Sequence, residues 1–155
     1  MHCFTEKDIV DIIFTYPHLD FLAKAIHNTD LVSQLRKNEQ DITFFAPVNA
    51  GFNNVPGMMD LFINNQTEML QILSRHKIIG HGALTTERIM DKMDGHTGLN
   101  MTINNHGGGF ITFYKSIDGA SFTVLEEKGF NKNRAIIAGD IHASNGVIHI
   151  IDGVL

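Results

Sequence analysis

The chain has 155 residues and a mass of 17.3 kDa, which suits one compact domain and excludes a second globular domain. Hydrophobic residues make up 43% of it, enough for a core that forms without a metal or a disulfide. Twelve Lys and Arg against seventeen Asp and Glu give a net charge of −5, with no basic cluster. Nucleic acid and anionic membranes are therefore disfavoured as partners.

The N-terminal region carries few signals of location. Cys3 is the single cysteine and cannot form a disulfide within the chain, so cysteine content does not identify the compartment. No apolar run approaches the roughly 18 residues of a membrane span. We expect residues 1–4 to be a flexible N-terminus of a single domain, 1–155, that does not insert into a membrane.

Three short helices are predicted in the first third of the chain. Thr5 is expected to cap the first, and apolar residues then recur at helical spacing from Ile9 onward. Pro17 marks a stop and a restart, after which the apolar pattern repeats as far as Leu35. Helices this short must pack their apolar faces against another element.

The middle of the chain alternates between strand and helix signals. Residues 42–46, Ile-Thr-Phe-Phe-Ala, are apolar on both faces, which is typical of a buried central strand that Pro47 then ends. Asn49 is expected to cap a following helical turn. Asn65 begins a capping pattern for a helix that ends near His76. A further short helix is predicted at 85–93, followed by turn residues.

From residue 99 onward the pattern has a period of two, which indicates β-strands. Six short strands separated by turn residues are expected, at 99–104, 110–115, 121–126, 134–138, 141–143 and 147–151. Helices first and strands later predict an α+β fold with antiparallel pairing.

The dipeptide Asn145-Gly146 between two apolar strands predicts a closing hairpin with a type I′ turn. In that register His142 pairs with His149, and Asp140 lies on the same face. The opposite face is then a core face that carries Ile141, Ala143, Ile148 and Ile150. Asp140, His142 and His149 together are an alternative functional site, because two histidines and a carboxylate are a common metal-ligand set.

Several segments resemble the fasciclin-like domain family. Residues 43–52, Thr-Phe-Phe-Ala-Pro-Val-Asn-Ala-Gly-Phe, resemble its first signature, and residues 145–155 resemble the second, which closes the domain. Residues 72–80, around His76, are similar to the family's central histidine segment, and residues 9–35 are similar to its leading helices. The likeness therefore spans nearly the whole chain.

The resemblance implies a wedge of antiparallel sheets, similar to a β-sandwich, with several short helices packed along one side. It also implies a non-catalytic adhesion module, without a cofactor, that is extracellular, on the cell surface or periplasmic. The expected partner is a cell-surface or matrix protein or a glycan. The domain is expected to be monomeric or part of a larger surface protein.

The central histidine segment is the family feature that implies a binding site. In animal members a tyrosine-histidine pair there has been tied to integrin binding, but Arg75 stands where the tyrosine is usual. The resemblance carries a partner-binding role onto Arg75, His76, Ile78 and Ile79. The competing interpretation is that His76 is a hydrogen-bonded histidine of the core.

Two further features bear on chemistry. Asp152 is the one acid of the closing segment and is expected to accept backbone hydrogen bonds, because a carboxylate beside a core needs such partners. A hydrolase is disfavoured, because Cys3 lies at the terminus and no serine has the strand-turn-helix setting of a nucleophile elbow.

Overall fold

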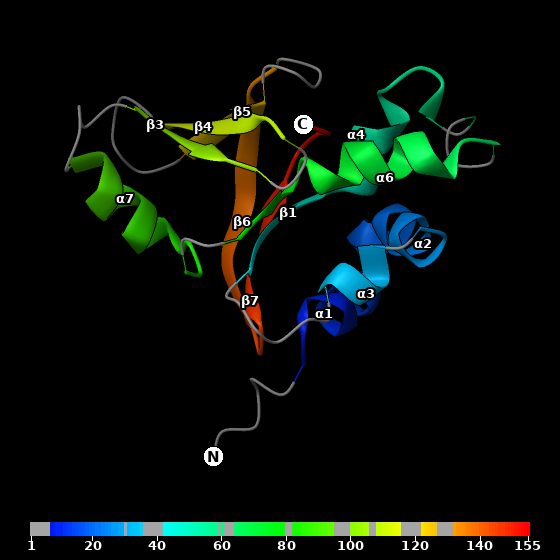
Figure 1. Cartoon of the computed structure of the whole chain (residues 1–155), viewed down its shortest axis with the longest axis horizontal. Helices are drawn as coiled ribbons and strands as arrows, with labels where there is room; N and C mark the ends of the chain where they lie inside the picture. Colours follow the sequence, from blue (N-terminus) through cyan, green and yellow to red (C-terminus); the bar gives the residue numbers. More distant parts are fainter. Residues whose placement is uncertain are drawn as a thin grey trace.

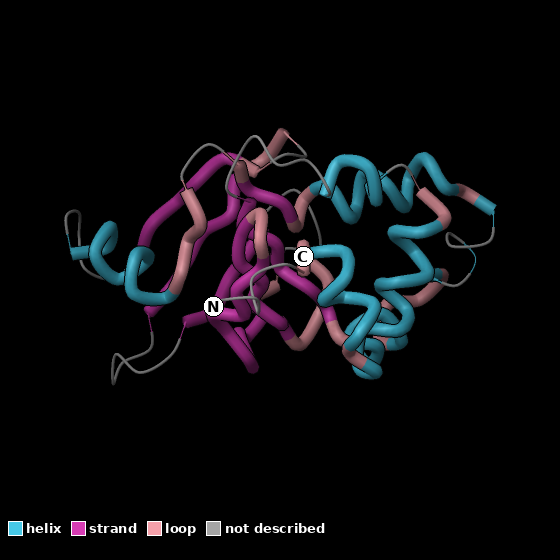
Figure 2. The backbone as a smooth tube through the Cα atoms, turned by 90° about the horizontal axis from the view of Figure 1, so that it is seen from below, coloured by secondary structure: helices cyan, strands magenta, loops and turns pink. Residues whose placement is uncertain are grey.

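The structure is a computed structural model, and it describes residues 7–29, 31–35, 42–58, 60, 64–79, 82–94, 100–105, 108–115, 122–126 and 132–155. Most helices gather on one side of the molecule and the strands on the other, with helix α7 beyond the far end of the sheet (Figures 1 and 2). Among the described residues, no helix is both long enough and apolar enough to span a membrane. The expected flexible terminus, 1–4, lies outside these ranges.

The first third forms the predicted helices, which are α1 (Ile9–Thr15), the 3-10 turn η2 (Pro17–Leu19), α2 (Asp20–His27) and α3 (Leu31–Leu35). The cap of α1 is Asp8, whose side chain accepts a hydrogen bond from the backbone N–H of Asp11 at 2.9 Å. Asp11 accepts in return from the backbone N–H of Asp8, which completes a capping box. The predicted cap, Thr5, lies outside the described residues.

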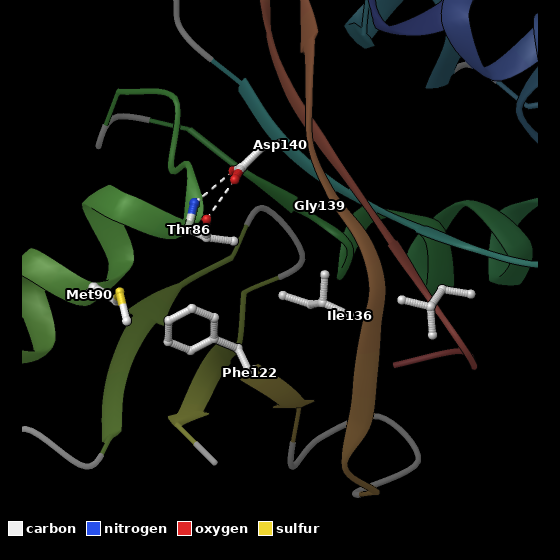
Figure 3. Close-up of a pocket in the computed structure, with 7 residues that line it drawn as sticks. Thr86, Met90, Phe122, Ile136, Gly139 and Asp140 are labelled. Atoms are coloured by element: carbon white, nitrogen blue, oxygen red, sulfur yellow. Dashed lines mark hydrogen bonds between the residues drawn. The ribbon is translucent and has the colours of Figure 1, made fainter. Parts of the chain in front are cut away.

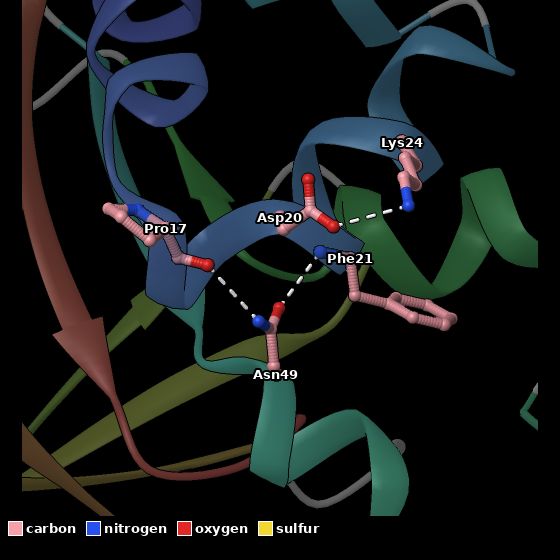
Figure 4. Close-up of polar contacts among 5 residues, drawn as sticks. All are labelled: Pro17, Asp20, Phe21, Lys24 and Asn49. Atoms are coloured by element: carbon pink, nitrogen blue, oxygen red, sulfur yellow. Dashed lines mark hydrogen bonds and ion pairs between the residues drawn. The ribbon is translucent and has the colours of Figure 1, made fainter.

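The later helices are α4 (Asn49–Asn53), α6 (Gln66–Ser74) and α7 (Thr86–Asp94). Asn65 caps α6 as predicted, since its Oδ1 accepts the backbone N–H of Glu68 at 3.1 Å. Asn49 does not cap its own helix, which begins after Val48 without a side-chain cap. Its side chain instead reaches α2 and η2, where it accepts from the N–H of Phe21 at 2.8 Å and donates to the carbonyl of Pro17 at 3.2 Å (Figure 4).

Seven strands form one sheet, and they are β1 (Ile42–Pro47), β2 (Lys77–Ile78), β3 (Asn100–Asn104), β4 (Phe110–Lys115), β5 (Phe122–Glu126), β6 (Arg134–Ala143) and β7 (Gly146–Ile151). Two predicted strands, 134–138 and 141–143, are therefore one strand, β6. The turn expected at Gly139 and Asp140 is a bulge, where the register with β7 shifts and Asp140 has a φ of 58°. A bulge and a turn both need residues that tolerate left-handed backbone, which is why the sequence signal is the same.

The strand order is β2-β1-β7-β6-β5-β4-β3. Every neighbouring pair is antiparallel except β1 and β7, which run parallel from the pair Ile42 and Gly146 to the pair Pro47 and Ile151. The α+β class is confirmed, but one mixed sheet, curled into a near-barrel, replaces the expected wedge of antiparallel sheets. Both parallel strands are buried at every residue, which is usual for parallel pairs.

The two faces of the central strands contribute to two cores. Phe44 packs under the helices with Ile148, while its neighbour Phe45 points into the curled sheet. There the ring of Phe45 lies 5.7 Å from the ring of Phe113. The residues predicted for the core face of the closing hairpin all lie in or against the core under the helices, and they are Ile141, Ala143, Ile148 and Ile150.

The register of the closing hairpin differs from the predicted one. Ala143 pairs with Gly146 and His142 pairs with Val147, so the pairing of His142 with His149 is wrong. Left-handed φ values occur, among the described residues, only at Asp140, Gly57, Gly82 and Gly108, which also excludes a type I′ turn at this hairpin.

Gly146 is needed because the backbone of β1 lies very close to it, and not because a turn requires a glycine there. A Cβ atom at this position would lie 1.9 Å from the carbonyl oxygen of Ile42, far inside a van der Waals contact. The backbone N–H of Ile42 also donates to the carbonyl of Asn145 at 2.9 Å. The close approach of the parallel strand β1, which no local sequence pattern reveals, therefore explains why a glycine stands at position 146.

Candidate functional site

The ring of His76, just after α6, is completely buried. Its Nδ1–H donates to the carbonyl of Ile72 at 2.9 Å, and its Nε2 accepts the backbone N–H of Leu155 at 3.0 Å. A ring that accepts at one nitrogen is neutral. Burial, aided by the charges of Arg75 and Arg134, lowers the pKa of His76 from 6.5 to about 4, although two backbone hydrogen bonds raise it. The segment therefore contains a neutral, buried histidine whose two hydrogen bonds connect parts of the core.

The other carried-over residues of the central segment differ in exposure. Ile78 is fully buried and pairs with Thr43 of β1, whereas Arg75 and Ile79 are half-buried. Arg75 caps the C-terminal end of α6 through its backbone N–H. A partner that docks on this segment would therefore contact Arg75 and Ile79 instead of His76.

The β6 bulge brings Asp140 beside His149 without the predicted strand pairing. The backbone N–H of Asp140 donates to Nδ1 of His149 at 3.2 Å, and Nε2–H of His149 donates to the carbonyl of Leu84 at 2.7 Å. Burial lowers the pKa of His149, so the ring stays neutral at physiological pH. Because both of its nitrogens are hydrogen-bonded, this imidazole offers no free lone pair to a metal.

The carboxylate of Asp140 holds the first residue of α7. It accepts from the backbone N–H of Thr86 at 2.7 Å and from the hydroxyl of Thr86 at 2.5 Å (Figure 3). Burial raises the pKa of Asp140. The hydrogen bonds from Thr86 and the nearby His149 and His142 lower it by more, so the pKa of Asp140 lies below its ordinary value. An anion at a helix N-terminus is favourable, so this contact fixes α7 against β6.

The structure does not bring Asp140, His142 and His149 together as one group. His142 is exposed, pairs with Val147, and lines a separate recess that it shares with Tyr16. Within the ranges that the structure describes, no three His, Cys, Asp or Glu side chains group in a way suited to a metal ion.

A small recess lies between α7 and the sheet, beside Asp140. Its volume is about 260 Å³, and Met90, Phe122 and Ile136 provide apolar walls (Figure 3). This is below the ~300–1,000 Å³ of pockets that hold cofactors or drug-sized ligands. The recess therefore fits at most a single side chain or a small group.

The interior also contains polar contacts that the sequence did not predict. Glu126 is 1% exposed and accepts a short hydrogen bond from Nδ2 of Asn105. Oδ1 of Asn105 accepts the backbone N–H of Gly109 at 3.0 Å, which closes the β3–β4 connection. Residues 21 positions apart make this pair, so no local pattern signals it. The prediction for Asp152 is confirmed, because it accepts the backbone N–H of Ala135 at 3.0 Å.

Comparison with known proteins identifies relatives of the chain. The Fasciclin domain model matches residues 17–155. An uncharacterized protein of Synechocystis sp. is 25% identical over 150 residues, which cover 96% of both chains. Fasciclin-1 of Drosophila melanogaster is 30% identical over 115 residues, and Stabilin-1 of Mus musculus is 31% identical over 116 residues. Those matches cover 74% and 73% of this chain but only 17% and 4% of the two animal proteins.

The fold also matches a solved structure, a FAS1 domain pair from the insect cell adhesion molecule Fasciclin I. The TM-score is 0.78 with 16% sequence identity, and the match covers 96% of this chain and 50% of that one. The similarity of fold extends over nearly every element described above. With the family model matched from η2 to Leu155, the chain belongs to the Fasciclin domain family.

Proposed function

We propose that the chain is a non-catalytic adhesion module that binds a cell-surface or matrix protein or a glycan. The observation that carries this proposal is the Fasciclin domain match over residues 17–155, together with the likeness to a domain pair of an insect cell adhesion molecule. Binding by surface complementarity needs a rigid scaffold, and two buried cores on either side of β1 and β7 supply one.

The chemistry of the described side chains supports a binding role over a catalytic one. The two histidines with shifted pKa values, His76 and His149, are neutral, buried and hydrogen-bonded at both ring nitrogens. The hydroxyl of Thr86 donates to the carboxylate of Asp140, and this hydrogen bond helps to hold the start of α7. A general base must have a free nitrogen or oxygen within reach of a substrate, and these groups have structural partners instead.

The proposed compartment is outside the cytoplasm, either extracellular, at the cell surface or periplasmic. It rests on the family and on the similarity of fold to Fasciclin I, which is an insect cell adhesion molecule. Protease treatment of intact host cells that carry the tagged full-length gene product tests it. Digestion on intact cells, or after the outer membrane alone is permeabilised, supports the proposal, and protection until the cytoplasmic membrane is lysed would contradict it.

The proposed contact surface includes Arg75 and Ile79, the half-buried members of the central segment. Arg75→Glu reverses a charge there without entering the core, since the side chain is half-buried and α6 is capped by backbone. Lys132→Glu is the matched control, because it makes the same change at an exposed position before β6. Beads that present either variant are compared with wild type on cells or matrix.

Loss of bead adhesion with Arg75→Glu, and retention with Lys132→Glu, supports this contact surface. Equal adhesion of all three proteins would place the surface elsewhere on the domain. Beads are required because such modules bind weakly per site, and linking copies on a surface multiplies their apparent affinity. Circular dichroism of both variants verifies that the comparison is between folded domains.

A further inference from the structure

Asn145 connects three parts of the chain that are far apart in sequence. Its side-chain Oδ1 accepts the backbone N–H of Ile9 in α1 at 3.0 Å. Its Nδ2 donates to the carbonyl of Leu35 in α3 at 2.5 Å, and its own carbonyl accepts from Ile42 in β1. The residue is 3% exposed. Two helices and the central strand are thus hydrogen-bonded to one asparagine.

Asn145 is also followed by glycine, and it is the one Asn-Gly dipeptide of the chain. Glycine has no side chain to hinder its own backbone nitrogen, which makes this dipeptide the most reactive asparagine context in an unfolded chain. In the fold, however, the amide of Asn145 is held by its contacts and Gly146 is paired with β1. The most reactive asparagine of the sequence is therefore among the best covered.

We propose that Asn145-Gly146 is a deamidation site that the native fold masks, so that the chain is modified only while the contacts of Asn145 are broken. Solvent hydroxide removes the backbone N–H proton of Gly146, and that nitrogen attacks Cγ of Asn145. The new N–Cγ bond closes a five-membered succinimide, the Cγ–Nδ2 bond breaks, and ammonia leaves after taking a proton from water. Water then opens the ring at either carbonyl and yields aspartate or isoaspartate.

The fold blocks the first step of this chemistry. Cγ of Asn145 must turn toward the nitrogen of Gly146, but its two polar atoms are bonded to Ile9 and Leu35. Release of the side chain therefore requires that α1 and α3 separate from the hairpin. Modification that needs an opened state proceeds at a rate proportional to the population of that state.

The products do not fit the native site. With aspartate, an oxygen replaces the Nδ2 donor and faces the carbonyl of Leu35, which places two acceptors together in a buried position. With isoaspartate, an extra backbone methylene lies just before the parallel pair of Ile42 and Gly146. Aspartate loses the bond to Leu35, and isoaspartate displaces the backbone that pairs with β1, so a chain that deamidates while unfolded does not regain the full stability of the native state.

The experiment follows deamidation in the native protein and in concentrated urea at one mildly alkaline pH and one temperature. Peptide mapping by mass spectrometry and an isoaspartyl methyltransferase assay quantify the change at Asn145. The expected native rate is at least about 100-fold below the rate in urea, the suppression given by an opened state populated at about 1%. Asn49 and Asn104, which are not followed by glycine, are internal controls in the same digests.

Refolding from urea after increasing times then measures the consequence. The fraction that regains cooperative unfolding should fall in step with deamidation at Asn145. Native and unfolded rates within a few-fold of each other would overturn the proposed masking. Recovery of full stability by chains that carry isoaspartate at this position would overturn the second half of the proposal. Both results are independent of whether the domain mediates adhesion.

Discussion

Nε2 of His76 accepts the backbone N–H of Leu155 at 3.0 Å, so the histidine after α6 is bonded to a residue 79 positions later. Leu155 is 1% exposed and belongs to the core inside the curled sheet. The same ring donates to Ile72 within its own helix. The central histidine of the segment that resembles a family binding motif therefore joins α6 to the segment that follows β7, and it does so only while it is neutral.

Stability should fall as pH decreases from about 6.5 to about 4. The pKa of His76 is 6.5 in its ordinary state and about 4 in the fold, so between these values the unfolded chain binds more protons and acid favours unfolding. The difference, 6.5 − 4 = 2.5, corresponds to a loss on the order of 3 kcal/mol. The lowered pKa of His149 acts in the same direction. Urea unfolding at a series of pH values measures the slope.

His76→Gln removes one titrating group and should flatten this pH dependence, although the variant is less stable at neutral pH. His27→Gln, at an exposed position on α2, is the matched control and should keep the wild-type slope. An NMR titration of His76 in the wild-type protein provides a second readout that does not depend on the variant. An unchanged slope in His76→Gln, or an ordinary pKa for His76, would contradict the assignment.

Gly146→Ala should destabilise the domain by about 3 kcal/mol or more, or prevent folding. The added Cβ would lie 1.9 Å from the Ile42 carbonyl oxygen, which is backbone and cannot move aside as a side chain would. Gly108→Ala separates this contact from backbone strain, since its φ is +86° and nothing lies within 4 Å. That control should cost only about 1–2 kcal/mol. Equal losses of unfolding free energy in the two variants would refute the close-approach explanation.

Asn49→Ala should cost about 1–2 kcal/mol, because it removes the cap that α4 supplies to the start of α2. Asn49→Asp keeps the acceptor for Phe21 and loses the donor to Pro17, so its loss should be smaller. Lys24→Ala, which breaks the exposed ion pair with Asp20 in the same region (Figure 4), should change stability by less than about 0.5 kcal/mol. Denaturant unfolding ranks the three, and a different order would contradict the assigned roles.

Chelation of metal ions should leave the thermal midpoint unchanged. The histidine closest to Asp140 uses both ring nitrogens in hydrogen bonds, and hydrophobic burial on both faces of β1 and β7 accounts for the core. Scanning calorimetry with and without EDTA measures this directly. A fall in the midpoint that added metal reverses would show that a metal supports the fold.

Local sequence patterns predicted those features that neighbouring residues determine. The apolar run at 42–46, the cap at Asn65 and the strand at Phe110–Lys115 each follow from spacing within one element, and each is present. The alternation of the closing hairpin also placed Ile148 and Ile150 correctly on a core face. These signals do not depend on which strand lies next to which.

Features that depend on distant neighbours could not be predicted in this way. Gly146 resembles a turn glycine, but its contact is Ile42, more than one hundred residues earlier in the chain. Asp140 and His149 do lie together, yet a bulge brings them there instead of the predicted register. The observed pairing differs from the predicted one by two positions, so the core face is kept, but His142 lies opposite Val147 and not opposite His149.

Adhesion of cells or matrix to beads that carry the wild-type domain, measured against the density of domains on each bead, tests the proposed adhesive function most directly. Adhesion should be negligible for the free monomer and rise steeply with density, because linked weak sites bind together. Adhesion that is absent at every density, or turnover of a hydrolase substrate by the folded wild-type protein, would contradict a non-catalytic adhesion module.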